Sequence, residues 1–387
     1  MSLPAEGRLD IEISVADGLF GPAIIRNQRP VGATAALAGR SPGEAVRLVT
    51  RLFSVCRLAQ GVAAAEAVEQ AAGQSAGAVQ RQARRMLLAG EMVLEHASRA
   101  LLDWPMLAGE APSLAALKAL RGALAALHGD LYPAGDWMCP GGGGLAPSAA
   151  PLSQRLATAR QVIGQAVFGG DAPVDPPSWR RWLATAHTAT ARLLAGLVEQ
   201  GLAGFGASSV TTLPALDPVL LATRLAADAD GAFVIRPDWQ GAVHQTGPLA
   251  RQAGQPLVAA ILAESGPGLL ALMAARLVEL ASALWEMEEI AARLCQDDGL
   301  FCSPAEGSGL GVVEAARGRL VHRVEMREGR VSRYQILAPT EWNFHPHGAL
   351  VDGLLGQPAG RDPEGRARLL IAALDPCVDY RLSLADA

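Results

Sequence analysis

The chain has 387 residues, of which half are hydrophobic and 4% aromatic, and its formal net charge is -5 at pH 7. The length is sufficient for a large core, and the apolar content comes mainly from Ala, Leu and Val, which favours helices. No block of basic residues is present, which argues against a nucleic-acid binder and against a protein that binds anionic membranes.

The first predicted element is a β-hairpin over "RLDIEISVADGLFGPAIIRN" (8–27), where apolar and polar residues alternate on both sides of Asp17-Gly18. From Gly43 to about Leu131, and again from Leu152 to Leu202, apolar residues recur at helical spacing. These regions are predicted to form the helices of a bundle. The segment between them, at about 132–151, is rich in Gly and Pro and is predicted to be a loop.

The second half of the chain begins with an expected short extended segment and turn in "DGAFVIRPDWQGAVHQTGPLARQ" (230–252), followed by a long helical region from about Ala250 to Leu294. "LGVVEAARGRLVHRVEMREGRVSRYQILAP" (310–339) alternates through two predicted strands joined by Glu328-Gly329. A last helix is expected near 364–374. The predicted fold class is mainly α (α+β), a helical bundle with small β elements near both termini.

The compartment is predicted from three features of the sequence. The most apolar stretches are interrupted by Glu, Arg or Gly before they reach the length of a membrane span, and the N-terminus lacks a secretory pattern. The five cysteines are odd in number and scattered, which predicts free thiols rather than a disulfide framework. A cytoplasmic protein is therefore expected.

Cys56 lies in "VRLVTRLFSVCRLAQGVAAAEA", a helical pattern in which it shares a face with Gln60. Arg47 and Arg51 are nearby in the sequence and are expected to lower the pKa of the Cys56 thiol. Residue type alone favours a different interpretation, a buried helical cysteine that acts as a small apolar residue.

The other reactive residue types give weaker signals. Cys377 follows Asp375-Pro376 and, like Cys56, lies outside any CxxC pair, which argues against zinc-finger and thioredoxin sites. His345 and His347 either reach a metal together or are ordinary loop histidines. The remaining cysteines are interpreted as structural: Cys139, Cys295 and Cys302. A serine-hydrolase GxSxG elbow, a P-loop and a GxGxxG after a strand are absent from the sequence.

Several segments, in order along the chain, resemble motifs of the nickel-iron hydrogenase large subunit. "EGRLDIEISV" resembles EGHLxIExxV, and "LAGRSPGEA" resembles GRxPxDA. "RLFSVCRLAQ" resembles RxCGxCxxxH, and "LLDWP" resembles LDW. Further on, "HQTGPLARQ" is similar to ExGPLAR and "DPCVDYRLS" to DPCxxCxxH. The longest match is "GVVEAARGRLVHRVEMREGRVSRYQILAPTEWN", which is similar to VEAPRGxLxHxxxxxxGxIxxYQxxxPTxWN. The resemblance implies a single hydrogenase large-subunit-like domain over 1–387, with the Gly/Pro-rich loop within it.

The departures from these motifs concern the metal ligands. In the first cysteine motif Cys56 is retained, and in the last Cys377 is retained. Five ligand positions of the family carry other residues in this chain. Phe53 and Tyr380 replace cysteines, Gln60 and Ser383 replace histidines, and Thr34 replaces the magnesium-site Glu. The resemblance therefore implies that neither the nickel site nor the magnesium site is present. We also expect no C-terminal extension for a maturation protease.

The residues that surround the diatomic ligands of the iron in this family are largely retained. The resemblance implies that Arg317 donates a hydrogen bond to one cyanide, that Thr340 donates one to the other, and that apolar side chains surround the carbon monoxide. The implied cofactor-binding residues are Arg317, Leu320, Ala338, Pro339, Thr340, Glu6, Asp103 and Asp375. The implied metal ligands are Cys56 and Cys377, and two soft thiolates suit low-spin ferrous iron.

This pattern resembles the hydrogenase expression/formation proteins of the HupK/HoxV type, accessory proteins related to the large subunit. The resemblance implies a scaffold, not a hydrogenase, that holds an Fe(CN)2(CO) unit transiently, with no nickel and no magnesium. The implied partners are the maturation proteins that build the iron unit and the nickel-iron hydrogenase large subunit or its chaperone, with no nucleic acid and no membrane span. Two alternatives are a metal-free chaperone or docking protein for the large subunit and a divergent iron-only redox enzyme. The second lacks a cysteine-rich cluster motif.

Overall fold

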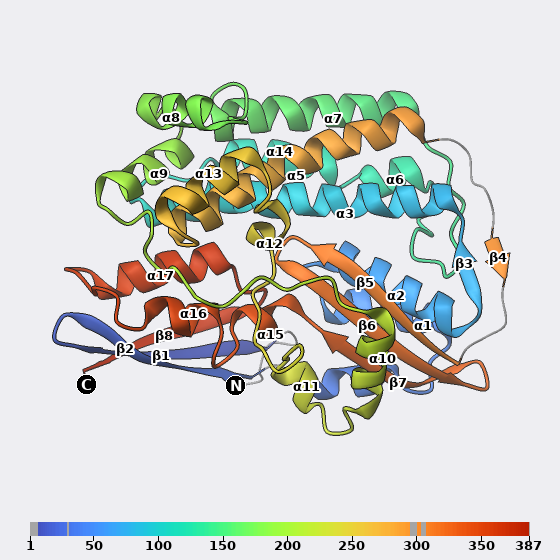
Figure 1. Cartoon of the computed structure of the whole chain (residues 1–387). Helices are drawn as coiled ribbons and strands as arrows, with labels where there is room; N and C mark the ends of the chain where they lie inside the picture. Colours follow the sequence, from blue (N-terminus) through green and yellow to red (C-terminus); the bar gives the residue numbers. More distant parts are fainter. Residues whose placement is uncertain (1–6, 29–30, 295–299, 303–306, 387) are drawn as a thin grey trace.

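The computed structural model describes residues 7–28, 31–294, 300–302 and 307–386. Helices form a broad upper layer, and two small sheets with a few short helices lie beneath it (Figure 1). The predicted fold class, mainly helical with small β elements near both termini, is confirmed. In the described part of the chain, the helices fall short of the combined length and apolarity that crossing a bilayer requires.

The N-terminal hairpin is present as predicted. Strand β1 (Arg8–Ala16) and strand β2 (Leu19–Asn27) pair antiparallel. Asp17 (φ 51°) and Gly18 (φ 76°) between them both have left-handed backbone, as a type I′ hairpin turn requires. The elements that follow are η1 (Val31–Leu37), α1 (Pro42–Leu52), α2 (Arg57–Ala71), β3 (Gln74–Ala76), α3 (Ala78–Ser98), η2 (Arg99–Asp103), α4 (Trp104–Leu107), α5 (Leu114–Leu124), α6 (Leu127–Leu131), α7 (Ala149–Ile163), η3 (Gly164–Phe168), α8 (Pro176–Thr185) and α9 (Ala189–Glu199).

The second half of the chain differs from the sequence prediction in two places. Residues 232–235 form a short helix rather than an extended segment, and the long helical region after residue 250 is divided into separate helices near Gly254 and Gly266. The strand region contains three strands, because a second tight turn lies at Ala316-Arg317. The elements are α10 (Pro218–Ala227), α11 (Ala232–Ile235), α12 (Pro248–Gln252), α13 (Pro256–Ser265), α14 (Leu269–Arg293), β4 (Leu300–Cys302), β5 (Ser308–Ala315), β6 (Gly318–Arg327), β7 (Arg330–Leu337), α15 (Pro339–Asn343), α16 (Ala349–Leu354), α17 (Pro363–Leu374) and β8 (Asp379–Asp386).

Many of these helices begin at a polar cap followed by proline. At α1, Ser41 and Glu44 form a capping box in which a Glu44 oxygen accepts from the Ser41 backbone N–H at 2.9 Å. The Asp175 side chain accepts from the Ser178 N–H at 2.8 Å at the start of α8, and aspartates cap α10 and α17 in the same way. Proline at the first helical position costs no hydrogen bond, which explains why these boundaries are sharp.

Two long helices, α3 and α14, form the centre of the upper layer and bury alanine, leucine and methionine side chains between them (Figure 1). Below them, α2 lies directly on β5. Gly309 and Gly311 of β5 face the α2 backbone, where any Cβ would overlap the carbonyl oxygens of Ala67 and Ala63. This glycine contact fixes the distance between α2 and the β5–β6 turn.

The sheet β2-β1-β8 joins the two ends of the described chain. Strand β8 pairs parallel with β1, with Leu9 opposite Tyr380 and Glu12 opposite Ser383. The second sheet has the order β5-β6-β7, and its last turn contains Glu328 (φ 51°) and Gly329 (φ 71°), as predicted. The β5–β6 turn of the second sheet lies beside α3, because Arg317 in this turn pairs with Glu95 of α3.

Residues 132–148 of the Gly/Pro-rich segment form a loop, and α7 begins at Ala149. Its Trp137 is buried and packs against Gly61 of α2. The Gly141 N–H donates to Glu69, whose carboxylate also pairs with the buried Arg84. The loop is therefore anchored to α2 and α3.

Candidate functional site

Cys56 occupies the N-cap position of α2, where the chain resumes helical structure after a break that follows α1. The break separates Cys56 from Arg47 and Arg51 of α1. Gln60 lies one turn into α2, and its Nε2 donates to Cys56 Sγ at 3.5 Å. The carboxylate of Glu91, on α3, accepts from the backbone N–H groups of Leu58 (2.7 Å) and Ala59 (2.9 Å). Glu91 thus caps α2 beside the Cys56 thiol.

Cys377 lies between α17 and β8, and its sulfur is held by Thr340. The Thr340 hydroxyl donates to Cys377 Sγ at 2.8 Å, and the Cys377 N–H donates to Thr340 Oγ1 at 3.1 Å. Thr340 is fully buried at the start of α15, directly after Pro339. The start of α15 and the segment that leads into β8 therefore fix the position of this thiol.

Arg317 lies in the tight turn between β5 and β6 and is only 3% exposed. Arg317 is therefore not a turn residue that pairs with solvent. Its Nη2 lies 2.9 Å from Glu95 Oε2, and its Nε lies 3.3 Å from Asp375 Oδ1. Burial on its own would lower the pKa of Arg317, but Asp375 and Glu95 outweigh burial and raise that pKa above its ordinary value.

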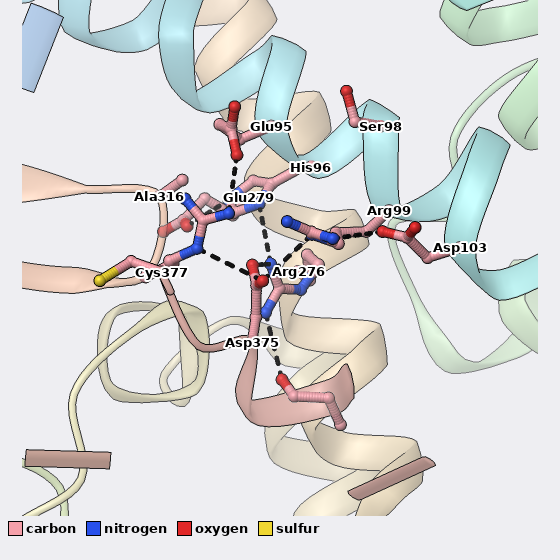
Figure 2. Close-up of polar contacts among 12 residues, drawn as sticks. Glu95, His96, Ser98, Arg99, Asp103, Arg276, Glu279, Ala316, Asp375 and Cys377 are labelled. Atoms are coloured by element: carbon pink, nitrogen blue, oxygen red, sulfur yellow. Dashed lines mark hydrogen bonds and ion pairs between the residues drawn. The ribbon is translucent and has the colours of Figure 1, made fainter. Parts of the chain in front are cut away.

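Asp375 is surrounded by three arginines (Figure 2). Its carboxylate oxygens lie 2.8 Å from Arg276 Nη1, 3.1 Å from Arg99 Nε and 3.3 Å from Arg317 Nε. Burial would raise the pKa of Asp375, but the three guanidinium groups hold it well below its usual range. Arg99 also pairs with Asp103, one turn further along η2. A π-helical turn such as η2 often marks a functional position in a helix.

His96 connects this cluster to a second one. His96 Nδ1 faces Arg276 Nη1 at 3.4 Å, so this nitrogen accepts, and Nε2 then donates to Glu279 at 2.8 Å. Burial lowers the pKa of His96 to about 4, so the ring is neutral at pH 7. Glu279 in turn binds Arg251 at 2.6 and 2.7 Å. The buried charges beneath α3 and α14 thus form one continuous network.

A cavity of about 490 Å³ opens beside Asp375. Its lining includes four of the residues that the sequence singled out: Asp103, Arg317, Asp375 and Cys377. Arg99, Met106 and Tyr380 form part of its remaining wall. A second cavity, of about 520 Å³, includes Thr34 and Phe53, two positions at which the resemblance implies a lost metal ligand.

The two thiols act on each other and on Arg317. Burial, together with the nearby charges of Glu91 and Cys377, raises the pKa of Cys56 to about 12, against the smaller opposing effects of Gln60 and Arg317. Both thiols also raise the pKa of Arg317. The expectation that Arg47 and Arg51 lower the pKa of Cys56 is therefore wrong: the arginine that acts on this thiol is Arg317, far along the chain.

The raised pKa gives a testable consequence. With a folded-state pKa of about 12, Cys56 is almost entirely a thiol at pH 8, and only thiolates react rapidly with iodoacetamide. We expect Cys56 to be alkylated at least about a hundredfold more slowly than the exposed Cys302. Mass spectrometry of tryptic peptides over time measures both rates. Equal rates in the native protein would contradict the buried, protonated state, and the rates should converge in 8 M urea.

The chain is similar to known proteins over most of its length. It is 32% identical over 389 residues to the hydrogenase expression/formation protein HupK of Rhizobium leguminosarum bv. viciae, covering 98% of this chain and 97% of that protein. It is also 32% identical over 413 residues to HoxV of Cupriavidus necator, covering 98% and 96% of the two chains. The chain belongs to the HupK/HoxV family of hydrogenase expression/formation proteins.

Two further comparisons relate this HupK/HoxV protein to the hydrogenases themselves. Residues 268–377 match the family described as nickel-dependent hydrogenase. The fold is similar to that of the Ni-Fe-Se hydrogenase from Desulfomicrobium baculatum in a reduced, active form, with a TM-score of 0.69, 16% identity and coverage of 94% and 95% of the two chains. The fold predicted from the resemblance is therefore confirmed.

The remaining candidate residues of this HupK/HoxV protein are less central. Leu320, Ala338 and Pro339 are fully buried, near Thr340 in sequence or on β6, but they are not part of the cavity lining. Glu6 lies outside the described residues. Within the described ranges, no group of three or more His, Cys, Asp and Glu side chains has the geometry to hold a metal ion. His345 and His347 have ring centres 5.8 Å apart and form no such group.

Sequence reasoning missed the charged partners in this HupK/HoxV site: Glu91, Glu95, Arg99 and Arg276. One signal was available for Arg276, which interrupts the apolar run "LLALMAARLVELASALW" and is 1% exposed. A charge inside such a helix is costly unless it is paired, so it predicts a buried partner. No local pattern distinguishes Glu95 or Arg99 from ordinary surface residues of α3 and η2.

Proposed function

We propose that this HupK/HoxV protein holds an Fe(CN)2(CO) unit during hydrogenase maturation and passes it to the large subunit of a nickel-iron hydrogenase or to its chaperone. Cys56 and Cys377 bind the iron as thiolates. The protein acts as an accessory scaffold, not as a catalyst, and it receives the unit from the maturation proteins that build it. The observation that carries this proposal is that Cys377 and the buried Arg317 line one cavity, with the Thr340 hydroxyl 2.8 Å from Cys377 Sγ.

The chemistry of the donor set supports an iron unit of this kind. Two thiolates and two cyanides contribute four negative charges, so with Fe²⁺ the complex carries a net charge of -2. A buried dianion requires cationic donors, and Arg317 is a planar guanidinium that cannot lose its proton at neutral pH. Thr340 adds a hydroxyl that contacts Cys377 Sγ. Leu320 and Ala338 contribute apolar surface nearby. Asp375 positions Arg317, and Asp103 pairs with Arg99.

We propose that neither nickel nor magnesium binds here. Phe53 packs among apolar side chains of α1 and α2, and the Tyr380 hydroxyl lies 3.4 Å from Arg368 Nη1. Neither side chain offers the soft thiolate that a nickel site needs. Thr34 and Ser383 likewise lack the carboxylate and imidazole of the family's magnesium site. Two thiolates, rather than four, also favour release of the cargo.

Transfer is a ligand exchange without a change of oxidation state. Two iron–sulfur bonds to Cys56 and Cys377 break, and two iron–sulfur bonds to cysteines of the acceptor form. The iron remains Fe²⁺, each departing thiolate keeps its electron pair and takes up a proton, and the acceptor thiols supply those protons. No oxidant or reductant is required.

Infrared spectroscopy tests the proposal. The protein is co-expressed with the maturation proteins and purified without oxygen, and we expect bands of bound cyanide and carbon monoxide together with iron by elemental analysis. Cys56→Ser and Cys377→Ser should each lose more than about nine-tenths of the band intensity, because each removes one of two iron ligands. Cys302→Ser, which changes an exposed thiol, is the matched control and should retain the bands.

The alternatives predict different outcomes. Protein that lacks both the bands and iron, with hydrogenase maturation intact in the Cys56→Ser and Cys377→Ser strains, would support a metal-free chaperone or docking protein. Hydrogen-dependent dye reduction by the pure protein would support a redox enzyme. Either result would contradict the scaffold proposal.

A further inference from the structure

Arg317 has a partner that the site residues from the sequence do not include. Glu95, which lies in the last turns of α3 and is labelled in Figure 2, places Oε2 2.9 Å from Arg317 Nη2. This nitrogen belongs to the guanidinium for which the family resemblance implies a hydrogen bond to a cyanide. In the unloaded protein, therefore, a carboxylate of the chain itself already holds a donor that the cargo requires.

The two carboxylates that bind Arg317 are held very differently. The Asp375 side chain is 2% exposed and is fixed by Arg276 at 2.8 Å and by Arg99 at 3.1 Å in addition to Arg317. The Glu95 side chain is 19% exposed, and in the described part of the chain Arg317 is its ion-pair partner. Glu95 can therefore turn toward water at small cost, whereas displacing Asp375 would leave several buried arginines without their counter-charge.

The charges of the cluster explain why the looser hold on Glu95 matters for the cargo. Three arginines (Arg99, Arg276 and Arg317) are matched by three carboxylates (Glu95, Asp103 and Asp375). A dianionic cargo that enters here adds two negative charges to this set and to the nearby Glu91, and it meets repulsion from the carboxylate nearest to its donor. In a partly buried site that repulsion is screened much less than in water.

We propose that Glu95 is an exchangeable counter-ion that competes with the iron unit for Arg317. Glu95 neutralises the buried guanidinium when the site is empty, turns aside when the cargo is loaded, and takes Arg317 back as the cargo leaves. This inference rests on the proposed function and explains how a site that binds a dianion can also release it. Glu95 is a positioning residue in this scheme and touches no iron ligand in the empty protein.

The test compares four proteins loaded by co-expression with the maturation proteins: wild type, Glu95→Gln, Glu95→Asp and Glu286→Gln. Glu95→Gln keeps the side-chain shape and removes the charge, whereas Glu95→Asp keeps the charge. Glu286→Gln removes a carboxylate that pairs with Arg85 at the edge of α14, away from this cavity, and is the matched control. Each loaded protein is mixed with the metal-free hydrogenase large subunit, and the decay of its cyanide infrared bands is followed.

We expect Glu95→Gln to retain the bands about tenfold longer than wild type, since it removes one charged competitor for Arg317. Glu95→Asp and Glu286→Gln should decay within about twofold of wild type. A damaged fold would lose the bands faster, so slower decay cannot arise from misfolding. Decay of Glu95→Gln at or above the wild-type rate would overturn the inference. Wild-type protein without bands would instead remove the proposed function, and the inference with it.

Discussion

Replacing Gly311 with alanine is expected to lower the free energy of unfolding by about 3 kcal/mol, because the new Cβ has no space. Gly311 lies on β5 directly against α2, and a Cβ there would overlap the carbonyl oxygen and carbon of Ala63. Backbone atoms of a packed helix cannot move aside as the end of a flexible side chain can, so α2 and β5 must separate. Urea unfolding followed by circular dichroism measures the loss.

The control for this variant has the opposite expected sign. Gly122 lies on the exposed face of α5, and a Cβ at that position meets no atom within 4 Å. Gly122→Ala should therefore raise the free energy of unfolding by about 0.5–1 kcal/mol, through the higher helix propensity of alanine. If Gly311→Ala unfolds at the wild-type urea concentration while Gly122→Ala is stabilised, the close packing of β5 on α2 is wrong. Because α2 carries Cys56 and β5 leads into Arg317, the same variant should also weaken cargo retention.

The second large effect is expected from Asp375→Asn, which should cost about 4 kcal/mol at pH 7. The asparagine keeps the shape of the side chain, but Arg99, Arg276 and Arg317 lose their shared counter-charge in a buried site. Removing one member of a buried ion cluster is far more costly than removing an exposed pair, because the remaining charges stay out of water. Asp103→Asn, which affects only the partly exposed pair with Arg99, should cost less than about 1 kcal/mol.

The pH dependence of the same variant follows from the direction of the Asp375 pKa. The three arginines hold that pKa below its usual value, so the folded state keeps the carboxylate ionised when the unfolded chain would take up a proton. The stability from Asp375 is fully present above the unfolded pKa of about 3.9 and is lost as the pH falls through the folded pKa. The difference between wild type and Asp375→Asn should therefore be constant from pH 7 to about pH 5 and shrink below about pH 4. A difference that grows on acidification would contradict this assignment.

Local features of the fold could be predicted from the sequence, because their cause is local. Asp17-Gly18 and Glu328-Gly329 both favour the left-handed backbone of a tight hairpin turn, and both turns are present. The Ala316-Arg317 turn was missed, since the signal there is one glycine, Gly318, within an alternating run. The short helix at 232–235 was read as extended because four apolar residues are compatible with either structure.

The sequence predicts less of the candidate site than of these local turns. Motif positions identified Cys377, Arg317 and Asp375, which line one cavity, but not the side chains that set their charge state. Glu95 and Arg99 contribute through contacts between α3 and the ends of other elements, and Arg276 contributes from α14. Such contacts depend on tertiary packing, to which neighbours in sequence give no guide. The pKa of Cys56 illustrates the point, because burial and Glu91 outweigh the arginines that are adjacent in sequence. The single-domain organisation and the ligand roles stay predictions.

The parallel pairing of β8 with β1 has a consequence for the order of biosynthesis. Leu9 is among the first described residues to leave the ribosome, and its partner Tyr380 is among the last. Cys377 is held between α17 and this final strand, so a nascent chain has only one of the two thiols in place while translation continues. Under the proposed function, the iron unit can gain its second thiolate only after the segment that contains Cys377 has been synthesised.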